Sequence, residues 1–324
     1  MNFTLKQLRY VEATGRLGSI ANAATELNIS QSSITAAIGA LESQIGFDLF
    51  VRTPAKGISV TPAGKETLRL IRGFIVQSRH FETEMMSVGG ESTGSVRVSC
   101  YATAAPSFLP PILKKFRVSH PNTSITLLEG NMEATMVYLA NGEADLAFCY
   151  DEMVEDGHDF TPLFGAPPYV LIAADDPLAQ NSSVCLKDLA ERPMIMLDLP
   201  RTKAYFINMF EHLGMKPNIV HSTRSAEIAR ALVSGGHGYS LLNICPPDYR
   251  HDDARFRVLP LRDKLHVPTF GIVTLAGIRK PNIVQAFIGQ CVDLERDGAF
   301  EGIVVKLPTI PPQNDARKRI KTVL

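Results

Sequence analysis

Hydrogen-bonding side chains are concentrated in a short stretch near the amino terminus. Within five residues the chain places one amide and three hydroxyl groups, on Gln31, Ser32, Ser33 and Thr35. Amide and hydroxyl groups both donate and accept hydrogen bonds, so they suit recognition of a polar edge on a ligand. Apolar residues interleave with them at spacings of four, three and four, at Ile34, Ile38, Leu41 and Ile45. This periodicity predicts a helix that buries its apolar face and presents the polar side chains near its first turn.

A second helix is expected immediately before this one. Ser19 is a candidate N-cap, and apolar residues follow at i, i+3, i+4 and i+7, at Ile20, Ala23, Ala24 and Leu27. The chain then has room for only a short turn before Ser30, the candidate cap of the next helix. Two helices joined this tightly are typical of a helix-turn-helix, whose second helix reads base edges in the major groove of DNA. The alternative is an ordinary helical hairpin with a solvated polar face.

A basic hairpin is predicted after Gly46. Residues 49–52 and 57–60 form two short strands, a winged hairpin that carries Arg52 and Lys56. Both side chains are candidates for contacts with phosphates or the minor groove, although Lys56 alone is equally compatible with a solvated loop. The whole chain has no net charge, but residues 1–80 hold nine basic groups and five acidic ones. DNA binding requires positive charge on the docking face only, so the neutral total is compatible with it.

Composition excludes several classes of protein. A chain of 324 residues that is 45% hydrophobic can bury more than one core, and it shows no uninterrupted apolar run of membrane-spanning length. No basic segment followed by an apolar stretch opens it, so we expect no signal peptide and a cytoplasmic location. The five cysteines are isolated in sequence, which favours reduced thiols over disulfides or a zinc site. We find no catalytic motif, expect no cofactor, and expect neither a metal site nor a membrane partner.

A long helix is predicted between the hairpin and the rest of the chain. Thr61 and Pro62 form a strong helix start, and the helix can continue to about Ser87. One apolar stripe contains Leu68, Ile71 and Ile75, and a neighbouring one contains Leu70, Phe74, Phe81 and Met85. So much apolar surface predicts a partner helix, most simply the same helix of a second copy. Residues 89–94 (Gly-Gly-Glu-Ser-Thr-Gly) then form a flexible linker.

Beyond the linker, apolar runs alternate with helical patterns, which predicts a parallel α/β sheet. One unit contains a strand at 124–128, a helix to Leu139 and a strand at 145–149. A second contains residues 218–225, a helix to Val233 and a strand at 239–242. Asn131 and Ser225 occupy matching places at helix starts. Two such units direct strand ends and helix N-termini toward a common cleft, although a chance match of strand–helix–strand units is the alternative.

Three motifs together resemble a known family. The helix-turn-helix, residues 46–52 (Gly-Phe-Asp-Leu-Phe-Val-Arg), residues 61–64 (Thr-Pro-Ala-Gly) and the α/β remainder are similar to LysR-type transcriptional regulators over about residues 4–300. The resemblance implies an α+β winged helix-turn-helix domain, a long linker helix, and an α/β two-lobed effector domain that is periplasmic-binding-protein-like. It also implies a dimer or homotetramer on double-stranded DNA, with a small-molecule effector in the cleft that alters DNA bending and recruitment of RNA polymerase.

From this resemblance we expect four segments. Residues 1–60 are the DNA-binding domain, 61–90 the dimerising linker helix, 91–306 the regulatory domain, and 307–324 a disordered basic tail. Within the regulatory domain, lobe I is expected over about 91–165 and 268–300, and lobe II over about 166–267.

The residue chemistry and the resemblance together assign the candidate site residues, and Ser32, Lys56 and Tyr101 come from the residue chemistry alone. The DNA-binding set is Gln31, Ser32, Ser33, Thr35, Arg52 and Lys56, and for Ser32 a role in the first helical turn is the alternative. The effector-binding set is Tyr101, Thr103, Asn131, Arg201, Thr202 and Ser225. Ala36 and Gly39 depart from the family, which often has basic residues there, so this helix has fewer phosphate contacts than usual. Gly39 also costs about 1 kcal/mol of helix stability relative to alanine.

Arg201 suggests the chemistry of the effector. Arginine pairs bidentately with carboxylates, so the site favours a small organic anion, aromatic or aliphatic, although Arg201 also fits a surface position. Thr103 has the alternative role of a plain helix cap. Tyr101, Tyr150 and Tyr205 are candidates for contact with an aromatic ring, and packing is their alternative role. Three other classes of protein remain open: a solute-binding protein, an enzyme, and a constitutive DNA-binding regulator whose C-terminal domain serves only assembly.

Overall fold

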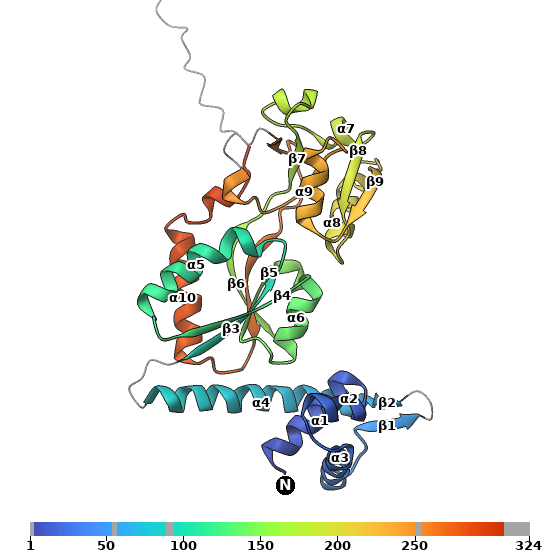
Figure 1. Ribbon diagram of the computed structural model, residues 1–324, viewed down its shortest axis with the longest axis vertical. Coiled ribbons are helices and arrows are strands. Elements are labelled where there is room, and N and C mark those ends of the chain that lie inside the picture. Colours follow the sequence, from blue (N-terminus) through green and yellow to red (C-terminus); the bar gives the residue numbers. More distant parts are fainter. Residues whose placement is uncertain (1–2, 54–56, 89–93, 250–254, 308–324) are drawn as a thin grey trace, which may run out of the picture. The chain divides into compact units, whose positions relative to one another are not determined.

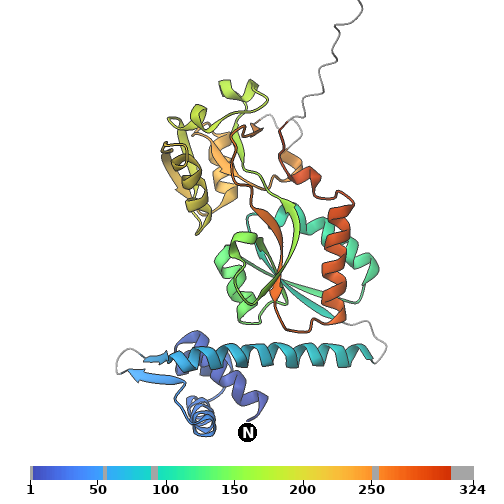
Figure 2. The ribbon, with the colours of Figure 1, turned by 180° about the vertical axis from the view of Figure 1, so that it is seen from behind.

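The computed structural model describes residues 3–53, 57–88, 94–249 and 255–307 (Figure 1 and, from behind, Figure 2). The chain forms two compact units. Of the described residues, the first contains those up to 164 and 269–299, and the second contains those within 165–268 and 300–307. We refer to the part of the first unit that follows the linker helix as lobe I, and to the second unit as lobe II. The predicted wing residue Lys56 and the tail from residue 308 lie outside the described residues.

The amino-terminal domain is a three-helix bundle with a hairpin. Its elements are α1 (Leu5–Leu17), α2 (Ile20–Glu26), α3 (Gln31–Ile45), β1 (Phe50–Thr53) and β2 (Gly57–Val60). The predicted caps are confirmed, because Ser19 accepts a hydrogen bond from Asn22 N–H and Ser30 one from Ser33 N–H. Gly46 ends α3 in the left-handed conformation, with φ +81°. Local sequence signals therefore set both ends of the helix-turn-helix.

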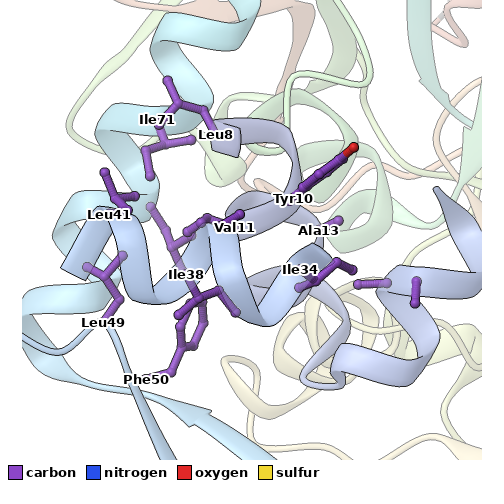
Figure 3. Packing of buried hydrophobic residues seen from close by; sticks show 14 residues of the cluster. Leu8, Tyr10, Val11, Ala13, Ile34, Ile38, Leu41, Leu49, Phe50 and Ile71 are labelled. Carbon is purple, nitrogen blue, oxygen red and sulfur yellow. The ribbon is translucent and has the colours of Figure 1, made fainter. Parts of the chain in front are cut away.

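One apolar core holds this domain together (Figure 3). Val11 of α1, Ile34 and Ile38 of α3 and Leu49 before the hairpin are all buried, and Ile71 of the next helix completes the cluster. The apolar face predicted for α3 is thus confirmed.

The linker helix α4 (Pro62–Val88) begins at the predicted Thr61–Pro62 start, where the Thr61 hydroxyl accepts a hydrogen bond from Gly64 N–H. Of its two apolar stripes, one is packed against the chain and the other is exposed. Leu68, Ile71 and Ile75 pack on the core of the same chain's amino-terminal domain. The second stripe is between 51% and 63% exposed at Leu70, Phe74, Phe81 and Met85.

Lobe I is a five-stranded sheet in the order β4-β3-β5-β12-β6. Its elements are β3 (Ser95–Tyr101), α5 (Ala105–Ser119), β4 (Ser124–Gly130), α6 (Met132–Ala140), β5 (Leu146–Tyr150), β6 (His158–Gly165), β12 (Thr269–Leu275) and α10 (Asn282–Arg296). Helices α5 and α10 cover one face and α6 covers the other, as Figures 1 and 2 both show. Strands β4, β3 and β5 are parallel, whereas β12 runs antiparallel to β5.

Lobe II contains two small sheets. Its elements are β7 (Tyr169–Ala173), α7 (Leu186–Leu189), β8 (Pro193–Leu197), α8 (Thr202–Glu211), β9 (Asn218–Thr223), α9 (Ala226–Ser234), β10 (Ser240–Leu242) and β11 (Phe256–Pro260). Strands β8 and β9 are parallel, but β7 is antiparallel to both β10 and β11. The predicted parallel arrangement is therefore found for β4-β3-β5 and for β8-β9, whereas β10 and β11 pair antiparallel with β7, and β12 with β5. Fully buried strands are continuously apolar in either direction, so composition does not distinguish them.

Candidate nucleic-acid interface and effector-binding surfaces

The first turn of α3 is closed by a cluster of serine hydroxyls. The Ser30 hydroxyl accepts a hydrogen bond from Ser33 N–H at 3.2 Å and lies 2.8 Å from the hydroxyls of both Ser32 and Ser33. Two of the predicted base-reading hydroxyls are thus engaged in the helix cap. This contact supports the alternative role of Ser32 in the first turn, and its side chain remains exposed.

Gln31 and Thr35 differ from these serines. Gln31 is exposed and Thr35 is half-buried, and neither has a hydrogen bond from its side chain within the described part of the chain. Both stand beside Ile34, which is buried in the core. The helix thus anchors its apolar face and leaves an amide and a hydroxyl at the margin of the opposite face.

Two arginines, one in this domain and one on the neighbouring α4, are already paired with acidic side chains. Arg16 hydrogen-bonds Glu26 and lies 3.6 Å from Glu12, and Arg72 lies 3.1 Å from the same Glu12. The hydrogen bond with Glu26 is the main reason that the pKa of Arg16 is raised. These arginines hold helices together and have less capacity for phosphates than their number suggests.

The two strands of the predicted wing are formed and pair with each other. Arg52 pairs with Ile58, and Thr53 with Gly57, across β1 and β2. This register places the backbone of Arg52 near the connection between the two strands. The Arg52 side chain and Lys56 lie outside the described residues.

In lobe I, the predicted effector residues gather at one edge of the sheet. Tyr101 ends β3 beside Gly130, which ends β4, and Thr103 and Asn131 follow directly. The Asn131 side chain accepts a hydrogen bond from Ala134 N–H at 2.8 Å and caps α6. Thr103 is not a cap, because α5 begins after Ala104 and has no side-chain cap. Its half-buried hydroxyl is thus left for another role.

Lobe II repeats this arrangement. Leu197 at the end of β8 pairs with Thr223 at the end of β9, so the loops carrying Arg201 and Ser225 begin side by side. Ser225 caps α9 by accepting a hydrogen bond from Ile228 N–H at 3.3 Å. The matching places of Asn131 and Ser225 at helix starts are therefore confirmed.

Arg201 has an unusual backbone. Its φ is +67° and its ψ −47°, and the N–H of Thr202 donates to the carbonyl of Pro200 at 2.8 Å. This is a tight γ-turn that a non-glycine residue adopts only under strain. Thr202 behind it is buried. Sequence reasoning did not single out Lys203, a second cation in the first turn of α8, whose ammonium lies 3.2 Å from Asp198.

Tyr101, Tyr150 and the acidic loop of residues 151–159 fit structural roles. Tyr101 is buried and meets the ring of Tyr150 edge-on at 6.1 Å between centroids. In the acidic loop, Asp151 accepts a hydrogen bond from Thr269 N–H at 3.1 Å. No group of histidine, cysteine or acidic residues in the described ranges is arranged to hold a metal ion. Within those ranges, no helix combines the length and apolarity needed to cross a membrane.

Comparison with known proteins identifies both parts of the chain. Residues 5–65 match the family described as bacterial regulatory helix-turn-helix protein, lysR family, and residues 89–296 match the LysR substrate binding domain. The chain belongs to the LysR family of transcriptional regulators. It is thus a regulator with a DNA-binding domain and an effector-binding domain, and its family is not one of enzymes.

Relatives of this LysR-type regulator cover nearly its whole length. The transcriptional regulator SsuR of Burkholderia cenocepacia is 24% identical over 91% of this chain and 94% of its own. The solved structure of a putative LysR family regulator from Pseudomonas aeruginosa is 30% identical, with a TM-score of 0.57, covering 90% of this chain and 99% of that one. A cysteine-to-aspartate variant of full-length OxyR from the same organism shares the fold, with 21% identity and a TM-score of 0.67 over 90% of this chain and 98% of that one.

Proposed function

We propose that this LysR-type regulator responds to a small organic anion, and that each lobe contributes one set of ligand-binding groups. The observation that carries this proposal is the loop after β8, where Arg201 is held in a strained turn beside the start of the Ser225 loop. Backbone strain persists only where the surrounding structure enforces it, and it occurs most often at ligand-binding positions. The turn fixes the backbone of Arg201, and its exposed side chain carries a guanidinium, the group that suits bidentate recognition of a carboxylate.

Lobe I supplies the uncharged groups that bind the same proposed ligand. Thr103 offers a hydroxyl that does not cap α5, at the end of a strand where polar ligands commonly bind in α/β sheets. Asn131 and Thr202 complete the proposed set, with Ser225 contributing through the helix start that it caps. Tyr101 contributes ring packing, because its side chain is buried.

For DNA, we propose that α3 enters the major groove and the wing contacts the backbone. Gln31 and Thr35 then read base edges, Ser32 and Ser33 support the first turn and face the duplex, and Arg52 and Lys56 bind phosphates. On this assignment Gln31→Ala changes the preferred sequence. Arg52→Ala weakens binding to all sequences. It also lowers the slope of log binding constant against log salt concentration by about one unit in magnitude. An unchanged binding motif for Gln31→Ala in a selection from random duplexes contradicts the assignment.

We further propose that two copies pair through the exposed stripe of α4, with a tetramer as the final assembly. An apolar stripe this long on one helix is typical of a helix that pairs with a partner. The proposed division of labour keeps residues 1–60 for DNA, 61–90 for pairing and 91–306 for sensing. Contact with RNA polymerase is part of this proposal and is tested by transcription from a promoter carrying the selected site.

A thermal-shift screen of the full chain against small organic acids tests the effector proposal. A ligand at one hundred times its dissociation constant adds about 2.7 kcal/mol of stability, which is readily seen as a higher melting temperature. The expected hit is lost in Arg201→Met and weakened in Thr103→Val. The matched control is Arg262→Met, which removes an exposed arginine of lobe II that lies 3.6 Å from Asp188. A hit that survives both site variants contradicts the residues proposed.

The alternative is a constitutive DNA-binding regulator whose C-terminal domain serves oligomerisation only. The capping roles of Asn131 and Ser225 favour this alternative, because both side chains have a structural use without any ligand. It predicts no stabilisation by any acid in the screen and DNA binding that no small molecule alters.

A further inference from the structure

The outward face of α3 carries only small, uncharged side chains. Counting from the buried Ile34 and Ile38, the helical period places four exposed residues opposite the core: Ser32, Ala36, Gly39 and Ser43. The helix has no lysine or arginine along its whole length. Its single acid, Glu42, accepts hydrogen bonds from Leu49 N–H at 2.7 Å and Phe50 N–H at 3.1 Å. This face therefore offers no cation to phosphates or guanines.

Two positions on this face stand out. Ala36 exposes a methyl group, and a Cβ added at Gly39 would meet no atom within 4 Å. Packing within the described chain therefore does not require a glycine at position 39. The backbone conformation does not require one either, because Gly39 does not have a positive φ. A glycine inside a helix nonetheless lowers stability by about 1 kcal/mol relative to alanine. No contact within the described chain compensates for this loss of stability. We therefore look for the reason for this glycine in a contact with a binding partner.

We propose that α3 recognises the C5-methyl group of thymine through Ala36, and that Gly39 lets the helix backbone approach the base edges closely. The inference rests on the proposed entry of α3 into the major groove. Thymine is distinguished there by its methyl group, and an alanine side chain is a suitable apolar contact for it. Gln31, at the margin of the same face, can pair with the adenine of a neighbouring base pair. Specificity thus comes from shape and methyl contacts instead of arginine.

The first test removes the methyl group from the DNA and leaves the protein intact. A duplex selected by the full chain from a random library is remade with single thymines replaced by deoxyuridine. We expect at least one position inside the footprint where the substitution weakens binding about fourfold, the effect of one methyl-sized group leaving an apolar contact. Ala36→Gly should bind the thymine and uracil duplexes equally. If no thymine methyl inside the footprint affects binding, the proposal is overturned.

The second test concerns the close approach. Gly39→Ala should raise the melting temperature, because alanine favours the helix, and should weaken DNA binding at least threefold. The matched control is Gly289→Ala in α10, which is also exposed, lies within a helix and has nothing within 4 Å of its added Cβ. That variant should raise the melting temperature and leave DNA binding unchanged. Full DNA affinity in Gly39→Ala contradicts the role given to this glycine.

A third variant separates this inference from the proposal beneath it. Ala36→Glu places a long negative side chain on the outward face, so it should abolish DNA binding wherever this face enters the groove. If Ala36→Glu binds normally, the placement of α3 fails, and the inference fails with it. If Ala36→Glu abolishes binding while every deoxyuridine duplex binds normally, the placement stands and only the reading of thymine methyl groups is overturned.

Discussion

His80 on the linker helix lies 3.2 Å from Asp145 in lobe I, measured from Nε2 to Oδ1. The other ring nitrogen of His80 lies 3.0 Å from the carbonyl oxygen of Arg279. Asp145 also accepts hydrogen bonds from Arg97, from its backbone N–H at 2.8 Å and from its guanidinium at 2.5 Å, and lies 3.6 Å from Arg79. One buried carboxylate thus joins the helix that follows the DNA-binding domain to the sheet of lobe I.

Asp145→Asn should destabilise the chain by about 3 kcal/mol at pH 7, because it leaves Arg79 and Arg97 without their shared counter-charge. Burial acts to raise the pKa of Asp145, but hydrogen bonds from His80 and Arg97 outweigh it and lower the pKa to about 2. A depressed folded-state pKa stabilises the fold above the unfolded value of 3.8, by about 2 kcal/mol, and this stability is lost as the pH falls toward 2. Unfolding free energies measured against pH should show this loss in the wild type and not in the variant.

The control for this measurement is Asp293→Asn, an exposed carboxylate that pairs with Arg296 one helical turn away. It should change stability by less than about 0.5 kcal/mol. Equal effects of the two substitutions contradict the role of the buried cluster.

Gly142→Ala should loosen the same contact by steric means. Gly142 has φ +70°, and an added Cβ would lie 2.2 Å from Cγ2 of Val76 on α4. Gly277 has φ +71° with no atom within 4 Å of an added Cβ, so Gly277→Ala reports the backbone strain alone. We expect Gly142→Ala to lower the melting temperature more than Gly277→Ala and to increase hydrogen exchange in α4. Equal effects of the two variants contradict packing of α4 against lobe I.

Phe74→Glu should disrupt pairing of two copies without unfolding either one. The Phe74 side chain is half exposed within the chain, so its replacement costs little packing in the monomer. Val118→Glu is the control, because Val118 is 82% exposed on α5 and belongs to no apolar stripe. Light scattering coupled to size exclusion should show a smaller particle for Phe74→Glu alone. An unchanged particle size for this variant contradicts the proposed role of the α4 stripe.

Thiol reactivity should be confined to one cysteine. Burial raises the pKa of Cys100 to about 11 and the pKa values of Cys149 and Cys291 to about 12, so these groups hold little of the reactive thiolate near neutral pH. Cys245 is also buried, and only Cys185 is partly exposed. A thiol reagent at pH 8 should modify one group rapidly, and Cys185→Ser should remove that phase. Two rapid phases in the folded chain contradict the burial of the other four.

The helix-turn-helix was predictable because its signals are local. Ser19 and Ser30 cap helices, Gly46 ends one, and the apolar period of α3 identifies its buried face, so each feature depends on residues within one or two turns. The candidate site was predictable in part. The places of Asn131 and Ser225 at helix starts follow from the strand–helix repeats, whereas Thr103 and Arg201 were assigned through the family resemblance. Two features could be seen only in the three-dimensional structure: the use of the Ser32 hydroxyl in the cap and the strained turn at Arg201.

The sequence by itself determined the helix-turn-helix with its boundaries, the strands of the hairpin and the apolar stripes of α4, because these depend on spacing along the chain. Only the tertiary structure decided which stripe of α4 is buried and which strands of the two lobes run antiparallel. It alone also showed that His80, Arg97 and Asp145 meet. Residues this far apart in sequence carry no shared local pattern, and their contact arises only when the sheet of lobe I and α4 are packed together.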